Sequence, residues 1–330
     1  MAQEALVIAD NEIRPGQRRV VNIPVARLYT NNWAYMPVSV HHSEKAGPTL
    51  FVCAAQHGDE VNGVEIIRRV LQHQSLKHMK GTLLAIPIVN VFGFLQGERY
   101  LPDRRDLNRS YPGSARGSLA SRMAHIFLEE IVSHSTHGID LHTAAVHRYN
   151  LPQIRADLTD SDTLAMGRAF GAPVMIHSRK RNKSLREIVA KRGIPIIVYE
   201  VGEALRFNEN GIQRGVDGVI RVMRHLGMLR KGRKQLPEPV RASDTRWVRA
   251  KKSGLVRLKY RAGKKVKRHD IIAFVTDPLG KNVVDLKAPF DGVIIGHTNL
   301  PLVNAGDAVI HVARAKLPPE IMAEIENLEE

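Results

Sequence analysis

A histidine and a glutamate lie three residues apart, just after a short apolar segment near the start of the chain. Residues 49–54 have the length and the β-branched or aromatic character of a strand, and apolar residues recur at helical spacing after Gly58. His57 and Glu60 would then lie on the loop at the carboxyl end of a strand, the edge where open α/β sheets bind ligands. An imidazole and a carboxylate on a tight turn can bind one cation, and zinc accepts both ligand types. By itself the pair still favours an ordinary surface loop, because this spacing is common.

Another histidine ends a second short apolar segment, residues 138–144. His142 would therefore stand at the end of a second strand. Two strand ends that each offer ligands are what a metal site requires, so the sequence predicts a site formed by His57, Glu60 and His142. Three protein ligands would leave one coordination position for water, as in catalytic zinc sites.

The composition is that of a soluble globular protein. Hydrophobic residues make up 43% and charged residues 25% of the 330 residues, a length that predicts two domains. The first ten residues lack a basic region followed by an apolar one, and no apolar run approaches membrane-spanning length. The single cysteine, Cys53, lies in an apolar segment, so we expect a buried, inert thiol and no disulfide. We expect a cytoplasmic protein without a secretory signal or a membrane partner.

The net charge of +16 is concentrated in one segment. Residues 230–268 contain sixteen Lys and Arg against two acidic residues, Glu238 and Asp244, and the rest of the chain is nearly neutral. A basic segment could attract nucleic acid. Its only aromatic residues are Trp247 and Tyr260, however, and stacking platforms interleave more aromatic side chains with the basic ones. A solvated basic face is favoured, and nucleic acid is not an expected partner.

Predicted strands and helices alternate over the first two thirds of the chain, which indicates a mixed, mostly parallel sheet flanked by helices. The predicted strands, besides 49–54 and 138–144, are 18–28, 35–42, 81–89, 173–177 and 194–200, and the predicted helices are 62–74, 118–134, 160–170, 185–191 and 212–226. The polar stretch 90–117 has little periodicity, and connections of this length are usually functional.

After about residue 240 the sequence pattern changes to short segments of alternating apolar and polar residues separated by turn-forming residues, which predicts a small all-β module. Two phrases in it, residues 249–257 and 286–294, resemble each other and are followed by Gly263 and Gly306, which indicates two pseudo-symmetric halves. We therefore expect an α/β domain (1–230), a linker (231–240), the β module (241–315) and a C-terminal tail (316–330).

Taken in order, the motifs of the first domain resemble the succinylglutamate desuccinylase and aspartoacylase family, relatives of the zinc carboxypeptidases. The matching motifs are residues 57–60, 90–93, 99–100, 106–113, 140–144 and 199–202. The β module also resembles the family's, and it is similar to a biotinyl or lipoyl barrel-sandwich. It lacks the Met-Lys turn that carries the cofactor in carrier domains, so we expect no modified lysine.

The resemblance implies one zinc ion per chain on His57, Glu60 and His142, where it would activate water and polarise a carbonyl. Asp140 would either orient one of these ligands or be only a residue of the turn. Glu200 matches the family's general base. Glu203 is its rival, and we prefer Glu200 because it lies directly at the strand end.

Arg99 matches the arginine that stabilises the oxyanion of the tetrahedral intermediate. The segment before Asp106 is longer than in aspartoacylase, so Arg104 or Arg105 could take this role instead. Asn108 and Arg109 match a pair that grips a substrate carboxylate. The alternative for this pair is a loop-stabilising hydrogen bond.

Together these residues predict a zinc-dependent amide hydrolase that removes the acyl group from a small, anionic N-acyl amino acid or related amide. A zinc carboxypeptidase acting on short peptides could use the same residues. A non-catalytic scaffold whose basic β module binds a polyanion is the alternative from a different class. The sequence leaves the acyl group, the amine and a homo-oligomer open.

Overall fold

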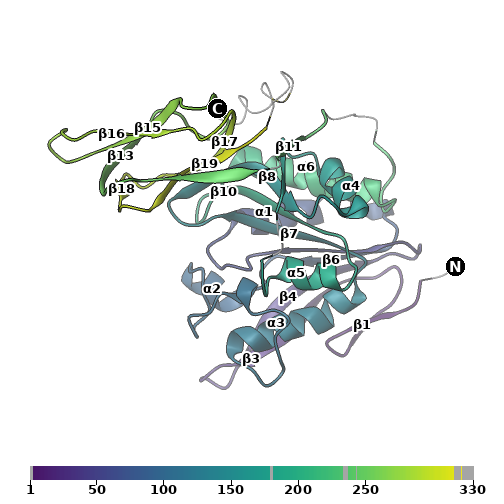
Figure 1. Ribbon diagram of the computed structural model, residues 1–330. Helices are drawn as coiled ribbons and strands as arrows, with labels where there is room; N and C mark the ends of the chain where they lie inside the picture. The colour runs from purple at the N-terminus through teal and green to yellow at the C-terminus, as the bar shows by residue number, and fades with distance from the viewer. Residues whose placement is uncertain (1–2, 179–180, 233–236, 243, 316–320, 322–330) are drawn as a thin grey trace.

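The computed structural model describes residues 3–178, 181–232, 237–242, 244–315 and 321. Among these residues, thirteen strands form one mixed sheet that runs through the molecule (Figure 1). Its main path is β12 (Thr245–Arg249), β19 (Ala308–Ala313), β17 (Gly292–Thr298), β8 (Arg148–Ala156), β10 (Ile196–Glu203), β7 (His137–Ala144), β5 (Thr49–Ala54), β6 (Thr82–Ile86), β4 (Trp33–His42) and β3 (Arg18–Arg27). Three further strands pair with this path or with each other: β9 (Val174–His177), β11 (Val240–Ala242) and β14 (Lys265–Val266).

Parallel pairing is confined to part of the sheet, so the expectation of a mostly parallel sheet is correct only for its centre. Strands β6, β5, β7 and β10 are parallel neighbours, and β9 pairs in parallel with β8 and β11. The other pairings are antiparallel, from β3 and β4 at one end to β17 and β19 at the other. The reason is the connections: a helical crossover joins parallel strands, whereas short turns reverse the chain between β3 and β4 and between β7 and β8.

Helices cover both faces of the central strands, and Figure 1 shows α4 and α6 together in the upper half of the view and α2, α3 and α5 together in the lower half. One face carries α1 (Asn62–Leu71), α4 (Ser161–Phe170) and α6 (Glu209–His225), and the other α2 (Val91–Gln96), α3 (Leu119–Glu130) and α5 (Leu185–Lys191). Short 3-10 turns lie at η1 (Gln74–His78), η2 (Leu107–Arg109) and η3 (Val132–His134), and an N-terminal hairpin is formed by β1 (Leu6–Ile8) and β2 (Asn11–Ile13).

Along β7 and β10, alternate side chains face the hydrophobic core on one side of the sheet and the candidate site on the other. Leu141 and Tyr199 are buried in the core against the α1, α4 and α6 layer. Their neighbours along the strands, Asp140, His142 and Glu200, point to the opposite face because successive side chains of a strand alternate. Polar groups can therefore gather on one face without interrupting the core on the other.

The C-terminal strands form two layers related by the expected internal repeat. A four-stranded sheet contains β16 (Val284–Lys287), β15 (Ile271–Thr276), β13 (Gly254–Leu258) and β18 (Leu302–Val303). Each of its pairings has a counterpart in the large sheet: β13 with β15 corresponds to β17 with β19, β16 with β15 to β12 with β19, and β13 with β18 to β17 with β14. The expectation of two related halves is confirmed.

The β module is joined to the first domain through the sheet, because β17 hydrogen-bonds to β8. The proposed domain boundaries stay predictions; residues 233–236 of the linker and the tail 316–330, apart from Ile321, lie outside the described residues. Within the described residues, no helix combines the length and the apolar character needed to cross a bilayer. The cytoplasmic location also stays a prediction.

Candidate active site

The loop after β5 turns back sharply and presents His57 and Glu60 side by side. Ala55 has a φ of 49°, in the left-handed region, and Gly58 packs against the backbone of α2. A Cβ at Gly58 would lie 1.9 Å from the carbonyl carbon of Gly93, so no other residue fits there without moving α2. His57 Nδ1 lies 2.8 Å from Glu60 Oε1, and both side chains are buried.

The end of β7 brings the third predicted ligand to the same point. His142 Nδ1 lies 2.7 Å from Glu60 Oε2. One ligand atom from each of His57, Glu60 and His142 lies within 4.8 Å of the others. Two imidazoles and a carboxylate are a donor set that zinc prefers. The residues present therefore fit a metal ion.

Each histidine has a second carboxylate behind it. His142 Nε2 lies 2.8 Å from Asp140 Oδ2, and His57 Nε2 lies 3.1 Å from Asp106 Oδ1. Metal-binding histidines usually contact such a group with the other ring nitrogen, which fixes the ring orientation and the tautomer. This contact favours the orienting role for Asp140 over that of a turn residue. The sequence analysis assigns no such role to Asp106, although this residue lies in the matching motif of residues 106–113.

Burial and charge act in opposite directions on these groups. Burial alone would raise the pKa of the Glu60 carboxyl, but His57 and His142 outweigh it and hold this pKa well below its usual range. Burial alone would lower the pKa of His142, but Asp140 and Glu60 outweigh it, and the pKa is raised. The carboxylates thus favour positive charge at this point, and a metal ion would replace protons there.

The register between β7 and β10 places Glu200, the predicted general base, next to the predicted metal ligand His142. Glu200 of β10 is directly opposite His142 of β7. Asn150 Nδ2 donates a hydrogen bond of 2.9 Å to Glu200 Oε2, and Arg155 Nε lies 3.6 Å from Glu200 Oε1. Both partners come from β8, the strand on the other side of β10.

Glu203 points elsewhere because β10 has an irregularity between the two glutamates, where Gly202 adopts a φ of 71°. Its carboxylate accepts hydrogen bonds of 2.8 Å from the His147 backbone N–H and from Asn299 Nδ2. Glu200 lines the same cavity as His57, Glu60 and His142, and Glu203 is not among its lining residues. The geometry therefore favours Glu200 over Glu203 as the reactive carboxylate.

Arg99 lies beside Glu60, one of the predicted metal ligands, whereas the two alternative arginines, Arg104 and Arg105, do not. Its Nη2 donates a hydrogen bond of 3.0 Å to Asp106, and its Nη1 lies 3.4 Å from Glu60 Oε1. Arg104 and Arg105 are exposed and are not among the residues that line the cavity. Arg105 donates to Ser118 Oγ instead.

Asn108 and Arg109 line the same cavity, and both also make local structural contacts. Asn108 Oδ1 accepts a hydrogen bond of 2.9 Å from the Leu185 backbone N–H at the start of α5, and Arg109 Nη1 donates to the Asn108 carbonyl. The loop-stabilising alternative thus accounts for the oxygen of Asn108. The amide nitrogen of Asn108 and the planar guanidinium of Arg109 carry the donors that a carboxylate needs.

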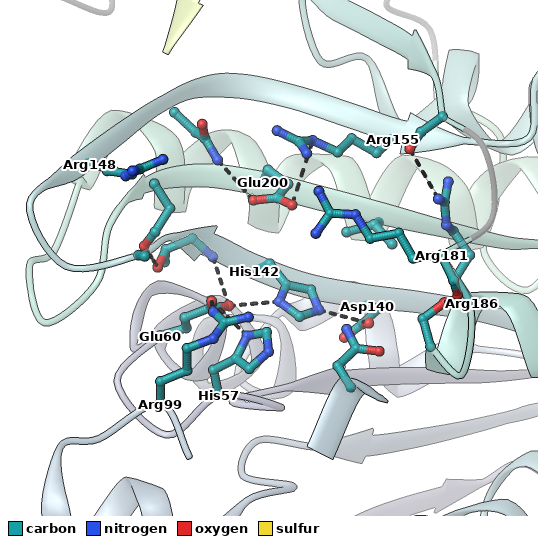
Figure 2. A pocket seen from close by; sticks show the side chains of 18 of the residues that line it. His57, Glu60, Arg99, Asp140, His142, Arg148, Arg155, Arg181, Arg186 and Glu200 are labelled. Carbon is teal, nitrogen blue, oxygen red and sulfur yellow. Dashed lines mark hydrogen bonds and ion pairs between the residues drawn. The ribbon is translucent and has the colours of Figure 1, made fainter. Parts of the chain in front are cut away.

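The cavity has a volume of about 260 Å³ and is rich in arginine. Figure 2 shows Arg99 with His57 and Glu60 on one side of Glu200, and Arg155, Arg181 and Arg186 on the other. The lining residues that the sequence analysis does not predict include Arg148, Asn150, Arg155, Arg181, Arg186 and Trp247. They come from β8, from α5 and the segment before it, and from β12, so only the fold brings them together.

Comparison with known proteins gives a consistent result. The sequence profile described as the succinylglutamate desuccinylase/aspartoacylase catalytic domain matches residues 46–226. The N-alpha-acetyl-L-2,4-diaminobutyric acid deacetylase of Halomonas elongata is 27% identical over 289 residues, which span 81% of this chain and 82% of that protein.

Two solved structures show the same fold. The product-bound ectoine utilization protein EutE (DoeB) from Ruegeria pomeroyi has a TM-score of 0.82 and 24% identity, covering 94% of this chain and 98% of that chain. A succinylglutamate desuccinylase/aspartoacylase from Rhodobacter sphaeroides has a TM-score of 0.81 and 24% identity, covering 92% of this chain and 97% of that chain. The likeness therefore extends over the α/β domain and the C-terminal β strands together.

Proposed function

The chain belongs to the succinylglutamate desuccinylase/aspartoacylase family, and on that premise we propose that it is a zinc-dependent, cytoplasmic deacylase of small N-acyl amino acids. The observation that carries the proposal is the position of Glu200, opposite His142 across the β7–β10 register and in the same cavity as His57 and Glu60. The deacetylase relative hydrolyses an amide of this kind, as its name states. The proposal includes a first domain of the zinc-carboxypeptidase type.

His57, Glu60 and His142 would hold the zinc ion, and Asp106 and Asp140 would fix the two imidazole rings. When bound, zinc would lower the pKa of water and polarise the amide carbonyl. Glu200 takes a proton from the attacking water and returns it to the leaving amine. Asn150 holds the Glu200 carboxylate for this transfer by donating to Oε2.

Arg99 would stabilise the charge that develops on the carbonyl oxygen. Its guanidinium is already oriented by Asp106 and lies beside Glu60, so no reorganisation is needed when the charge appears. Asn108 and Arg109 bind the carboxylate of the amino acid.

The size of the cavity favours a small substrate over a peptide chain. Its volume of about 260 Å³ is bounded on one side by Trp247 of the β module. This supports a deacylase over the carboxypeptidase alternative. The retained ligands, carboxylate base and arginine argue against a non-catalytic scaffold.

The experiment that tests the proposal is a screen of the zinc-loaded full-length protein against N-acyl amino acids, with release of free amine as the signal. We expect hydrolysis of at least one small N-acyl amino acid and none of tripeptides with a free carboxyl end. Efficient trimming of peptides from their carboxyl end, with no deacylation, would overturn the assignment.

We predict that Arg109→Ala selectively impairs substrates with a free carboxylate. Loss of a charged hydrogen bond of about 1.5 to 3 kcal/mol should lower kcat/KM about ten- to a hundred-and-fifty-fold. An amidated analogue lacks the group that Arg109 binds, so wild type and variant should hydrolyse it with similar, low efficiency. Equal losses on the acid and the amide would show that Arg109 is structural.

We also predict that Arg99→Ala and Arg105→Ala differ strongly. Removing a donor of the oxyanion type typically lowers kcat by about 100- to 1,000-fold. Arg105 is exposed and bonds Ser118, so its removal should leave kcat nearly unchanged. Steady-state kinetics of the two variants, with zinc content measured in both, will check this; a larger loss in Arg105→Ala would reassign the role.

A further inference from the structure

A line of buried polar side chains ends at His142. Its members are Tyr111, Gln56, Cys53 and Asp140, and each of the four is 0% exposed. Asp140 is the member next to His142, as Figure 2 shows. The other three are not among the residues that line the cavity, so they are out of reach of a substrate. We call Tyr111, Gln56 and Cys53 the buried polar chain.

Each member contacts the next. Tyr111 Oη donates a hydrogen bond of 3.0 Å to Gln56 Oε1. Gln56 Nε2 lies 4.0 Å from Cys53 Sγ, and Cys53 Sγ lies 3.4 Å from Asp140 Oδ1. The other carboxylate oxygen of Asp140, Oδ2, lies 2.8 Å from His142 Nε2. The contacts therefore run from the Tyr111 hydroxyl to a predicted metal ligand without interruption.

The sheet itself places the thiol beside the carboxylate. Cys53 of β5 is directly opposite Asp140 of β7 in the parallel register. Gln56 follows in the turn after β5, directly before His57. A contact set by strand pairing does not depend on the conformation of an exposed loop, so the position of the thiol is fixed by the fold.

The thiol supplies a proton that the carboxylate needs. Burial, and then the charge of Asp140, raise the pKa of the Cys53 thiol well above its usual range, so the sulfur keeps its proton. An ionised carboxylate only accepts hydrogen bonds, whereas a thiol can donate one. Asp140 thus accepts from the thiol on one oxygen and from His142 on the other. Within the described residues its carboxylate has no third partner.

The plane of the Asp140 carboxylate determines how His142 is held. The last torsion of an aspartate side chain has a broad energy profile, so hydrogen bonds rather than rotamer preference select its angle. Without the thiol, one oxygen of Asp140 would be buried without a donor, and the carboxylate could turn away from the imidazole. The groups behind a metal-binding histidine fix its orientation and tautomer, and their loss weakens metal binding.

The same segment of chain supports the other histidine. Asp106 Oδ1 lies 3.1 Å from His57 Nε2. Tyr111 comes five residues later and begins the contacts that reach His142. Residues 106–111 therefore contribute to the orientation of both imidazoles, one directly and the other through the buried polar chain.

We propose that Tyr111, Gln56 and Cys53 are positioning residues for the metal ligand His142, acting through Asp140. The inference rests on the metal site of the proposed function and adds residues that touch neither the metal position nor the cavity. The alternative is that these side chains only fill the core. Cys53 and Tyr111 do pack in the apolar cluster on this face of the sheet, so the experiment must separate packing from hydrogen bonding.

Two matched comparisons make this separation. Cys53→Ala and Cys53→Ser both lose the volume of sulfur, but the serine hydroxyl can still donate to Asp140. Tyr111→Phe keeps the ring that packs edge-on against Phe127, with centroids 6.3 Å apart, and removes only the hydroxyl. Tyr199→Phe is its control, because Tyr199 is equally buried and donates to the Gly211 carbonyl in the core on the opposite face.

The readouts are taken on the full chain without substrate. The zinc Kd is measured by competition with a chelator, and the visible absorption spectrum of the Co²⁺-loaded protein reports the geometry of the ligands. We expect Cys53→Ala to weaken zinc binding about ten- to a hundredfold and to alter the Co²⁺ spectrum. Cys53→Ser should stay close to wild type in both. Tyr111→Phe should show a smaller loss in the same direction, and Tyr199→Phe should lower the Tm and leave zinc affinity and spectrum unchanged.

A double-mutant cycle tests the route through Asp140. In the Asp140→Ala background the acceptor of the thiol is gone, so Cys53→Ala should cause no further loss of zinc affinity. A further loss as large as in wild type would overturn the route. The circular dichroism spectrum and Tm of each variant establish that it is folded; if Cys53→Ala does not fold, the comparison of Tyr111→Phe with Tyr199→Phe decides.

The outcomes also separate this inference from the proposed function. Equal losses of zinc affinity in Cys53→Ala and Cys53→Ser, or equal spectra for Tyr111→Phe and wild type, would show that the buried polar chain only fills the core. Metal binding that responds to these variants as expected, without hydrolysis of any N-acyl amino acid, would overturn the proposed function and leave the positioning role standing. Wild type that binds neither zinc nor Co²⁺ would overturn both.

Discussion

His142→Ala is expected to abolish zinc binding and hydrolysis while the protein remains folded. His142 lies at the end of β7 on the cavity face, whereas the adjacent Leu141 carries the core contacts of the other face. Removing the imidazole takes away one of three ligands and leaves Asp140 and Glu60 as uncompensated carboxylates. Zinc content by atomic spectroscopy, activity and the circular dichroism spectrum measure the three outcomes.

The same result is expected for His57→Ala and Glu60→Ala, because each contributes one ligand atom to the same point. His78→Ala is the control, since His78 is exposed in η1 and is not among the cavity residues. It should retain zinc and full activity. Zinc at one equivalent in all three ligand variants would disprove the assignment.

The proximity of His57, Glu60 and His142 could be predicted from the sequence because the patterns that place these residues at strand ends are local. His57 and Glu60 lie on one strand-loop-helix unit, and His142 ends a second apolar strand with the same character. The helical and strand periods that locate these ends are strong in segments buried on one or both faces. Most of the predicted helices and strands of the first domain were therefore correct to within a few residues.

The remainder of the cavity depends on the strand β8, which the sequence analysis does not predict. Its sequence contains Pro152, and the polar residues Asn150, Gln153 and Arg155 interrupt any apolar alternation. They are polar because they face the cavity and the β module rather than the core. Asn150 bonds Glu200, and Gln153 Nε2 donates to the Ile295 carbonyl. Because its polar residues and Pro152 remove the alternating apolar pattern, the sequence of β8 resembles that of a loop.

Local sequence patterns also did not predict that the β module contributes Trp247 to the cavity. Trp247 occurs in the basic segment, where the sequence indicated a solvated face. Only the pairing of β12 with β19 and of β17 with β8 brings its ring to the cavity. Long-range register of this kind has no signal in a single sequence, because the residues that meet are separated by about the length of a domain.

Glu200→Gln is expected to keep one equivalent of zinc and to lose most of the rate. The amide retains the shape of the side chain and can still accept the hydrogen bond from Asn150, but it cannot take up a proton. Positioned acid–base groups contribute on the order of 100- to 10,000-fold, so kcat should fall by that factor while KM changes little.

Glu203→Gln is the matched substitution, and it should show the reverse pattern. The Glu203 carboxylate accepts from the His147 backbone and from Asn299, and thereby connects the end of β10 to the loop after β17. A glutamine has one oxygen for these two donors, so we expect a loss of stability of about 1 to 3 kcal/mol and a lower Tm. The value of kcat should stay within a few-fold of wild type, because the carboxylate does not line the cavity. If instead Glu203→Gln loses the rate and Glu200→Gln loses only stability, the general base is Glu203, and the register of β10 against β7 does not select the reactive carboxylate.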